Sequence, residues 1–153
     1  MAGTFSQIYI QAVFAVKGRD NQLLEPWRND VFKYMAGIIT EKNQKSIIVN
    51  GVANHVHLLI GLKPVMPLSE LMRDIKNNTT HFINDKQLIK GKFSWQEGYG
   101  AFSYSHSQLD SVYQYILNQE EHHRKKTFKE EYLGFLQKFE IDHDENYLFE
   151  WIE

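Results

Sequence analysis

The stretch KSIIVNGVANHVHLLIGL, residues 45–62, has the composition of two β-strands joined by a short turn. The dipeptide Asn50-Gly51 is a strong hairpin signal, but β-branched residues continue through Val52. We therefore place the turn at Ala53-Asn54, with one strand on either side of it. The sequence thus predicts an antiparallel hairpin near the middle of the chain, and the flanking segments add to it.

The second strand of this hairpin carries two histidines separated by one valine. Because successive side chains of a strand alternate between its faces, His55 and His57 point the same way. The opposite face is apolar and consists of Val56, Leu58 and Ile60. One face therefore belongs to a core, and the other presents two imidazoles side by side. Such a pair is either incidental on a half-exposed strand or one half of a metal site.

The segments on either side of the hairpin show the periods of further strands and helices. In chain order we predict a strand at 8–16, a helix from Pro26 to near Asn43, the hairpin, a helix at 67–83, a glycine-broken aromatic strand within 93–105, and a third helix at 106–126 capped by Ser105 or Ser107. This order is typical of an α+β fold of the ferredoxin-like, split β-α-β kind with an antiparallel sheet. Residues 128–153 are expected to add a C-terminal helix and an acidic, extended tail to this single domain, 1–153.

Composition excludes several classes of protein. The 153 residues are 42% hydrophobic with three prolines, which indicates one folded domain rather than a disordered chain. No apolar run approaches the roughly 20 residues of a membrane span, and the N-terminus lacks a signal-peptide pattern. With no cysteine, neither a disulfide framework nor a thiolate metal site is possible. A cytoplasmic protein without a membrane partner is therefore expected.

The charge is unevenly distributed along the chain. All 17 lysines and arginines lie at or before Lys138, whereas six acidic residues follow it, so residues 1–138 carry a net charge of +4 although the whole chain carries −2. A mildly basic body with an acidic tail is compatible with nucleic-acid binding, but a solvated tail explains it equally simply. The candidate phosphate contacts are Lys17, Arg19, Arg73 and Lys76.

Polar residues of the third predicted helix form a stripe beside its apolar face. At about 100° per residue, Tyr115, Gln119 and His122 fall on one side of the helix. If the apolar face packs on the sheet, this stripe lies over the strand face that bears His55 and His57. The result would be a metal held by two imidazoles and by either an amide or a third imidazole, with a phenol beside it.

This constellation has a definite chemical use. A divalent cation with three protein ligands keeps positions open for a phosphate oxygen and water. An unperturbed tyrosine has a pKa of about 10 and is protonated at neutral pH. The positive charge of the cation would lower this pKa and so favour the tyrosinate. The tyrosinate could then attack a phosphodiester and retain the bond energy in a phosphotyrosine link.

Taken together, HVHLLI at 55–60 and FSWQEGYGAFSYSHSQLDSVYQYILNQEEHH at 93–123 resemble a known family. This family is the HUH-type single-tyrosine transposases of bacterial insertion sequences, which include the REP-associated tyrosine transposases. The similarity continues into IYIQAVFAVKGRDN at 8–21 and TFKEEYLGFLQKFEIDHDENYLFEW at 127–151. It therefore covers nearly the whole chain.

The resemblance implies a role for each part of the predicted site. His55 and His57 would coordinate a divalent metal, Mg²⁺ or Mn²⁺, together with Gln119. Either His122 or His123 could take the place of that glutamine. Mixed nitrogen and amide-oxygen ligands suit Mn²⁺ at least as well as Mg²⁺.

The resemblance also implies the reaction. The nucleophile would be Tyr115, four residues before Gln119, whereas Tyr113 lies on the other side of the helix. Single-stranded DNA with hairpin-bearing ends would be cleaved through a 5′-phosphotyrosine and rejoined to another strand, at the nucleoid. A homodimer is implied, with the site completed either within or between subunits. The alternative is a non-catalytic module that binds single-stranded nucleic acid.

Overall fold

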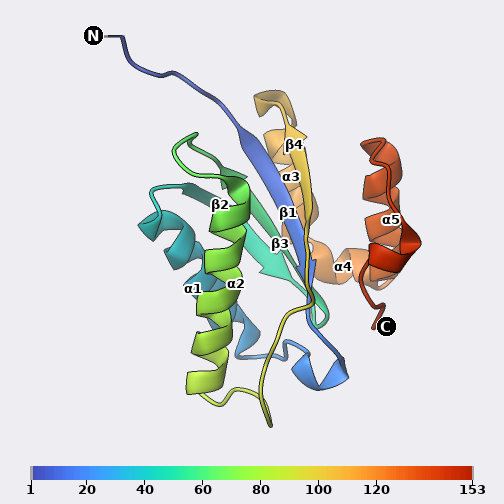
Figure 1. The fold of residues 1–153 in the computed structure, drawn as a ribbon. Coiled ribbons are helices and arrows are strands. Elements are labelled where there is room, and N and C mark those ends of the chain that lie inside the picture. The colour runs from blue at the N-terminus through green and yellow to red at the C-terminus, as the bar shows by residue number, and fades with distance from the viewer. Residues whose placement is uncertain (1, 153) are drawn as a thin grey trace.

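A computed structural model of the chain describes residues 2–152 and contains a single antiparallel sheet. The strands and helices are β1 (Tyr9–Ala15), α1 (Arg28–Glu41), β2 (Lys45–Gly51), β3 (His55–Gly61), α2 (Leu68–Asp85), β4 (Gly100–Tyr104), α3 (Leu109–Leu117), α4 (Gln119–His123) and α5 (Phe128–Lys138). The strand order is β2-β3-β1-β4, and every neighbouring pair is antiparallel (Figure 1). The predicted α+β, ferredoxin-like fold is confirmed.

The sheet has a helical layer on each face. Helices α1 and α2 cover one face, and α3, α4 and α5 lie beyond the other (Figure 1). Two residues of β1 on opposite faces show this division. The ring centroid of Phe14 lies 5.7 Å from the Lys76 ammonium of α2, whereas the Gln11 amide is hydrogen-bonded to His57. Both faces of β1 are therefore covered, which explains why it is buried from Gln11 to Ala15.

The central hairpin turns where the β-branched residues end. Gly51 of β2 pairs with Val56 of β3, and Val52 N–H donates to the His55 carbonyl at 3.1 Å. A Cβ atom at Gly51 would overlap that same carbonyl oxygen, so only glycine fits at the end of β2. The turn at Ala53-Asn54 is therefore confirmed, and it sets the position at which His55 enters the sheet.

The third predicted helix is broken, contrary to the continuous helix expected over 106–126. A 3₁₀ turn at His106–Gln108 precedes α3, and α4 begins only after Asn118 leaves helical geometry with ψ at 29°. The Asn50 amide of β2 donates to the carbonyls of Ile116 and Leu117 at 2.9 and 3.1 Å. These are carbonyls that a continuous helix would use for its next turn, so a side chain from the sheet ends α3.

The C-terminal segment packs against the body of the protein. Thr127 caps α5 in a capping box with Glu130. After α5, Gln96 exchanges two hydrogen bonds with the Glu150 backbone at 2.7 and 2.8 Å, and Asn54 donates to the Ile152 carbonyl at 2.6 Å. The end of the chain is thus held beside the turn that precedes His55.

None of the helices within residues 2–152 has the length and apolar character needed to cross a membrane.

Candidate metal and tyrosine site

The two histidines of β3 are completely buried on one face of the sheet, as the strand period predicts. Their ring centroids are 5.1 Å apart. The His55 ring is stacked on Phe128 of α5 at 3.9 Å, with only 7° between the planes. The pair therefore faces the layer that contains α4 and α5.

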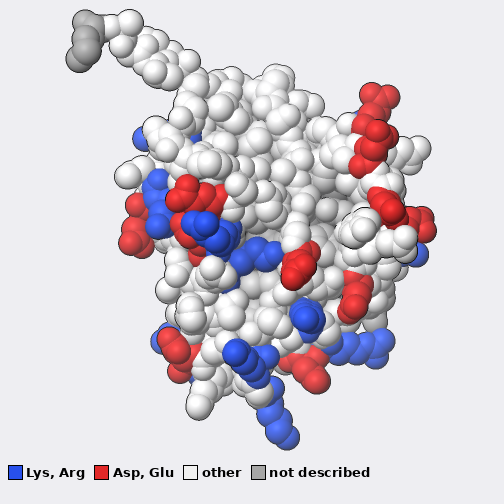
Figure 2. All heavy atoms as spheres, viewed as in Figure 1, with Lys and Arg blue, Asp and Glu red and all other residues white. Residues whose placement is uncertain are grey.

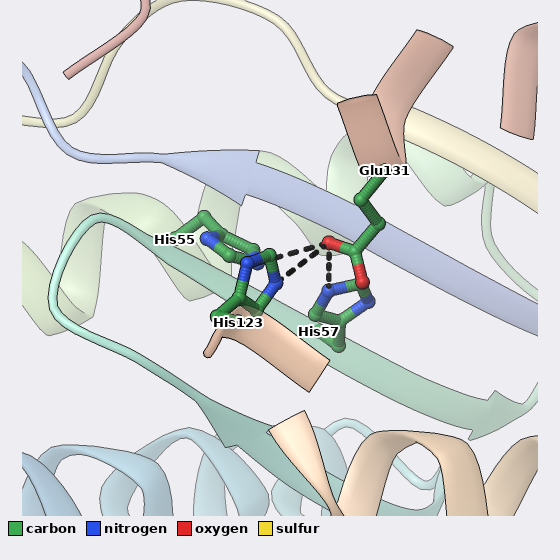
Figure 3. Close-up of side chains that lie close together, drawn as sticks. All are labelled: His55, His57, His123 and Glu131. Carbon is green, nitrogen blue, oxygen red and sulfur yellow. Dashed lines mark hydrogen bonds and ion pairs between the residues drawn. The ribbon is translucent and has the colours of Figure 1, made fainter. Parts of the chain in front are cut away.

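A carboxylate that sequence reasoning missed lies at the centre of the site. Glu131 of α5 places its Oε1 atom 3.1 Å from Nε2 of both His55 and His57, and 3.2 Å from Nε2 of His123 (Figure 3). Glu131 is 4% exposed. The available signal was its position on the apolar stripe of α5, next to the buried Tyr132. A charged residue on the core side of an amphipathic helix needs a partner.

Helix α4 contributes Gln119 and His123 to the same cluster. The Gln119 Oε1 atom lies 3.3 Å from His55 Nε2 and 3.1 Å from His123 Nε2, and its amide donates to Glu131 Oε2 at 3.2 Å. His122 instead stacks on the Tyr115 ring at 4.4 Å. Of the two histidines considered as a third imidazole, the structure brings His123, one turn after Gln119, into the cluster, whereas His122 stays beside Tyr115 as the helical wheel predicts.

The predicted nucleophile reaches this cluster within one chain. The Tyr115 hydroxyl donates a short hydrogen bond to Glu131 Oε2, and the Tyr115 and His57 ring centroids are 6.2 Å apart. Tyr113 and Tyr115 both pack against an apolar cluster formed by Leu59, Val112 and Ile116, but it is the Tyr115 hydroxyl that bonds to Glu131. The structure thus brings together Tyr115, Gln119 and the histidine pair.

The donor atoms fit a divalent cation. The four ligand atoms of His55, His57, His123 and Glu131 all lie within 4.8 Å of one another. Two atoms bound to the same ion at about 2.1 Å are about 3.0–3.4 Å apart, for right-angle or tetrahedral geometry. The observed nitrogen–oxygen separations of 3.1 and 3.2 Å match this spacing. A buried set of three imidazoles and one carboxylate is a donor set that transition metals prefer.

Burial and neighbouring charges shift the pKa values of His55, Glu131 and Tyr115. Burial, opposed by the hydrogen bond to Glu131, lowers the pKa of His55 to about 4, so this imidazole is a neutral donor at neutral pH. Burial alone would raise the pKa of Glu131, but the surrounding imidazoles outweigh burial and hold the pKa well below its usual range. Burial and the Glu131 charge together raise the pKa of Tyr115, so the phenol stays protonated in the metal-free protein.

Further side chains fix the orientation of both β3 histidines. The Gln11 amide nitrogen lies 2.9 Å from His57 Nδ1, and Tyr104 donates to the other end of that amide at 2.7 Å. Similarly, Asn54 Oδ1 lies 2.7 Å from His55 Nδ1. With their Nδ1 atoms engaged, both rings turn Nε2 toward Glu131. Asn54 Oδ1 accepts from His55 Nδ1–H, as the outer partner of a metal-binding histidine does, and leaves Nε2 free. The Gln11 amide N–H donates to His57 Nδ1, so a metal on His57 Nε2 requires this amide to turn its oxygen toward the ring.

Two cavities adjoin Tyr115. One, of about 360 Å³, extends between α3, α5 and the sheet, and the other, of about 210 Å³, lies toward α4. Lys126 lines both, Lys138 lines the larger and Lys125 the smaller. The phenol is therefore reachable from solvent next to cationic side chains.

The basic residues chosen from the sequence lie away from this point. Lys76 donates to the carbonyls of Gln96 and Gly98 at 2.8 and 3.0 Å, and Arg73 lies near two acidic neighbours on α2. Helix α2 covers the opposite face of the sheet, where Figure 2 shows both signs of charge interspersed. Lys17 and Arg19 follow β1, at the end of the sheet where β3 begins. The structure does not gather these four residues around Tyr115.

A strand bearing a His-x-His pair opposite a tyrosine helix defines the HUH class of single-tyrosine DNA enzymes. The sequence model of the IS200-like transposases matches residues 4–119, and the chain belongs to this transposase family. No curated protein sequence matches the chain.

Two solved structures have a similar fold. A protein assigned as a transposase from Deinococcus radiodurans R1 is 20% identical, with a TM-score of 0.61 over 78% of this chain and 95% of its own. A REP-associated tyrosine transposase bound to a REP hairpin is 15% identical, with a TM-score of 0.59 over 80% of this chain and 74% of its own. At these identities the likeness shows the fold.

Proposed function

We propose that this transposase cleaves and rejoins single-stranded DNA with Tyr115 as its nucleophile and a divalent metal held by the buried cluster. His55, His57, His123 and Glu131 would hold the metal, and Gln119 stands close enough to join them. Nitrogen and oxygen donors in this mixture suit Mn²⁺ at least as well as Mg²⁺.

One observation carries the proposal. The carboxylate of Glu131 contacts three imidazoles through Oε1 and accepts the hydrogen bond of Tyr115 through Oε2. A phenol that is hydrogen-bonded to the centre of a metal site is in position to attack a phosphate bound there. All these residues come from a single chain, so we propose that the site assembles within one subunit.

The reaction is a direct exchange of phosphoester bonds. The Tyr115 oxygen forms a bond to phosphorus while the bond from phosphorus to the 3′ oxygen breaks. The phenol gives up its proton to solvent and the leaving 3′ oxygen takes one up from water, which leaves a 3′-hydroxyl and a 5′-phosphotyrosine. Glu131 Oε2 holds the phenol in position through its hydrogen bond. A divalent cation in the cluster would stabilise the tyrosinate and the negative charge on the phosphate oxygens. Attack of another strand's 3′-hydroxyl on the phosphotyrosine reverses these steps and joins the strands.

The substrate is proposed by analogy. The REP-associated transposase of similar fold was solved with a REP hairpin. By analogy, we propose that the substrate of this chain is a DNA hairpin next to a single-stranded segment. We expect the ends of the transposable element that this enzyme moves to have this form. Such a substrate places the enzyme with the chromosomal DNA, and a homodimer remains a prediction.

The experiment that tests this function is covalent trapping. A labelled hairpin strand from the DNA flanking the gene is incubated with the protein and Mn²⁺ and then resolved under denaturing conditions. We expect a protein–DNA adduct that EDTA and Tyr115→Phe abolish and that the matched control Tyr113→Phe retains. An adduct that persists in Tyr115→Phe would refute the assignment of the nucleophile. DNA binding without any adduct in the wild type would instead indicate a non-catalytic binding module.

A further inference from the structure

We propose that the 360 Å³ cavity beside Tyr115 holds one unstacked nucleobase of the DNA strand, next to the phosphate that is cleaved. This proposal rests on the proposed function and specifies how the strand is positioned. We call the cavity the base pocket and define it by Gln11, Tyr104, Ser111, Gly134, Phe135 and Lys138, with Tyr115 and Glu131 at its inner wall. Its volume lies within the range of about 300–1,000 Å³ that is usual for small-molecule sites.

The walls of the base pocket are suited to a flat aromatic ligand. Tyr104 and Phe135 are only partly buried, although each is packed against other rings on its far side. Val112 adds aliphatic surface from α3. Bases stack on such side chains whatever their identity, because every base has a π-face. A strand drawn to Tyr115 would therefore gain binding energy by turning one base into this space.

Charge is placed where the backbone of that nucleotide would run. Lys126, in the turn between α4 and α5, and Lys138, at the end of α5, are exposed and line the pocket. The smaller cavity shares Tyr115, Glu131 and Lys126 with the base pocket, but it is lined by His123 of the metal cluster where the base pocket has aromatic walls. The space around the phenol thus has one part next to the metal cluster, suited to the phosphate, and an aromatic part suited to a base.

Gly134 keeps the base pocket open. It lies inside α5, where glycine is less favourable than alanine. A Cβ atom built at this position would meet nothing within 4 Å, so a larger residue would extend into open space without a clash. Gly37 of α1 also has nothing within 4 Å of a built Cβ and lies outside the base pocket. The two glycines therefore provide a matched test and control.

The first measurement requires neither metal nor cleavage. The fluorescent base 2-aminopurine is moved one position at a time along the single-stranded segment of the hairpin oligonucleotide, in EDTA. We expect the wild type and Gly37→Leu to quench one position strongly and Gly134→Leu to leave it bright, with melting temperatures of both variants no lower than that of the wild type. If no position is quenched, or if Gly134→Leu quenches it equally, the base pocket is refuted. Gly134→Ala, which fills less space, should give an intermediate result and guards against misfolding of the leucine variant.

The second measurement links the base pocket to the reaction. With Mn²⁺, the size of the released fragment identifies the cleaved phosphate, which should adjoin the quenched position. Gly134→Leu should form adduct roughly tenfold more slowly than the wild type on an intact strand, but equally on a strand that lacks this base. A cleaved phosphate remote from the quenched position would overturn the proposal. Quenching without any adduct in the wild type would refute the proposed function while still showing that the pocket binds a base.

Discussion

At the scale of single residues, the Glu131 carboxylate connects the two parts of the site. It is 3.1–3.2 Å from three imidazole nitrogens and hydrogen-bonded to the Tyr115 phenol. Its position on the apolar stripe of α5 indicates a buried charge, but no local pattern identifies its partners, because His55 and His57 lie more than 70 residues earlier in the chain, 74 in the case of His57. The histidine pair was predictable because strand alternation is a local rule. The third imidazole was narrowed to His122 or His123, and the choice between them depends on packing against β3 and α5 that no local rule gives.

Replacing this carboxylate by an amide should weaken the metal site. Glu131→Gln keeps the shape of the side chain but removes its charge, so we expect Mn²⁺ affinity to fall at least tenfold and adduct formation to fall with it. Isothermal titration calorimetry measures the affinity directly. The matched control is Glu130→Gln, whose carboxylate is exposed and belongs to the helix cap. Equal Mn²⁺ affinity in wild type and Glu131→Gln would contradict a role for Glu131 as a ligand.

The buried, neutral state of His55 predicts a pH dependence of stability in the metal-free protein. Its pKa is about 4 in the folded state, below the usual 6.5, so the unfolded chain takes up a proton that the folded protein does not. Stability is therefore complete above pH 6.5 and falls as the pH drops toward 4. Between pH 7 and 4.5, denaturation in EDTA should show the wild type losing about 2 kcal/mol more than His55→Gln. A constant difference between the two proteins would contradict this account.

At the scale of elements, a break separates α3, which carries Tyr115, from α4, which carries Gln119 and His123. Asn50 ends α3 through hydrogen bonds to carbonyls 66 and 67 residues away in the sequence. Hydrophobic periodicity predicts where a helix lies, but it contains no information about a helix cap that comes from a distant strand. The helices, strands and hairpin turn were therefore predictable from local pattern, whereas the separation of α4 was not.

Removing the Asn50 side chain, which is not a metal ligand, should displace residues that are. Asn50→Ala loses both hydrogen bonds to the end of α3, which should lower the free energy of unfolding by about 1–2 kcal/mol. Because α4 carries Gln119 and His123, Mn²⁺ affinity should also fall. The exposed Asn77 of α2 provides the control, since Asn77→Ala should change neither quantity. If Asn50→Ala lowers stability but leaves Mn²⁺ affinity intact, the cap does not position α4.

At the scale of the whole molecule, one chain contains every part of the site. Tyr115 reaches the cluster from α3 of the same subunit in which β3 supplies the histidines. Two inactive variants should therefore not rescue one another. A mixture of Tyr115→Phe and His57→Ala should give no more covalent adduct than either protein alone, as measured by denaturing electrophoresis. Recovery of adduct toward one quarter to one half of the wild-type level would show that the tyrosine acts on a partner's cluster.

The anchored end of the chain has a practical consequence. Ile152 is tied to Asn54, the residue that precedes the first metal-site histidine, whereas the other end of the chain leads away from the sheet as a free arm (Figure 1). Affinity tags, fluorophores or surface-immobilisation handles at the carboxyl end would load the segment that is hydrogen-bonded next to His55. Attachment at the amino end avoids that segment, and is the arrangement to choose for single-molecule recordings of strand exchange.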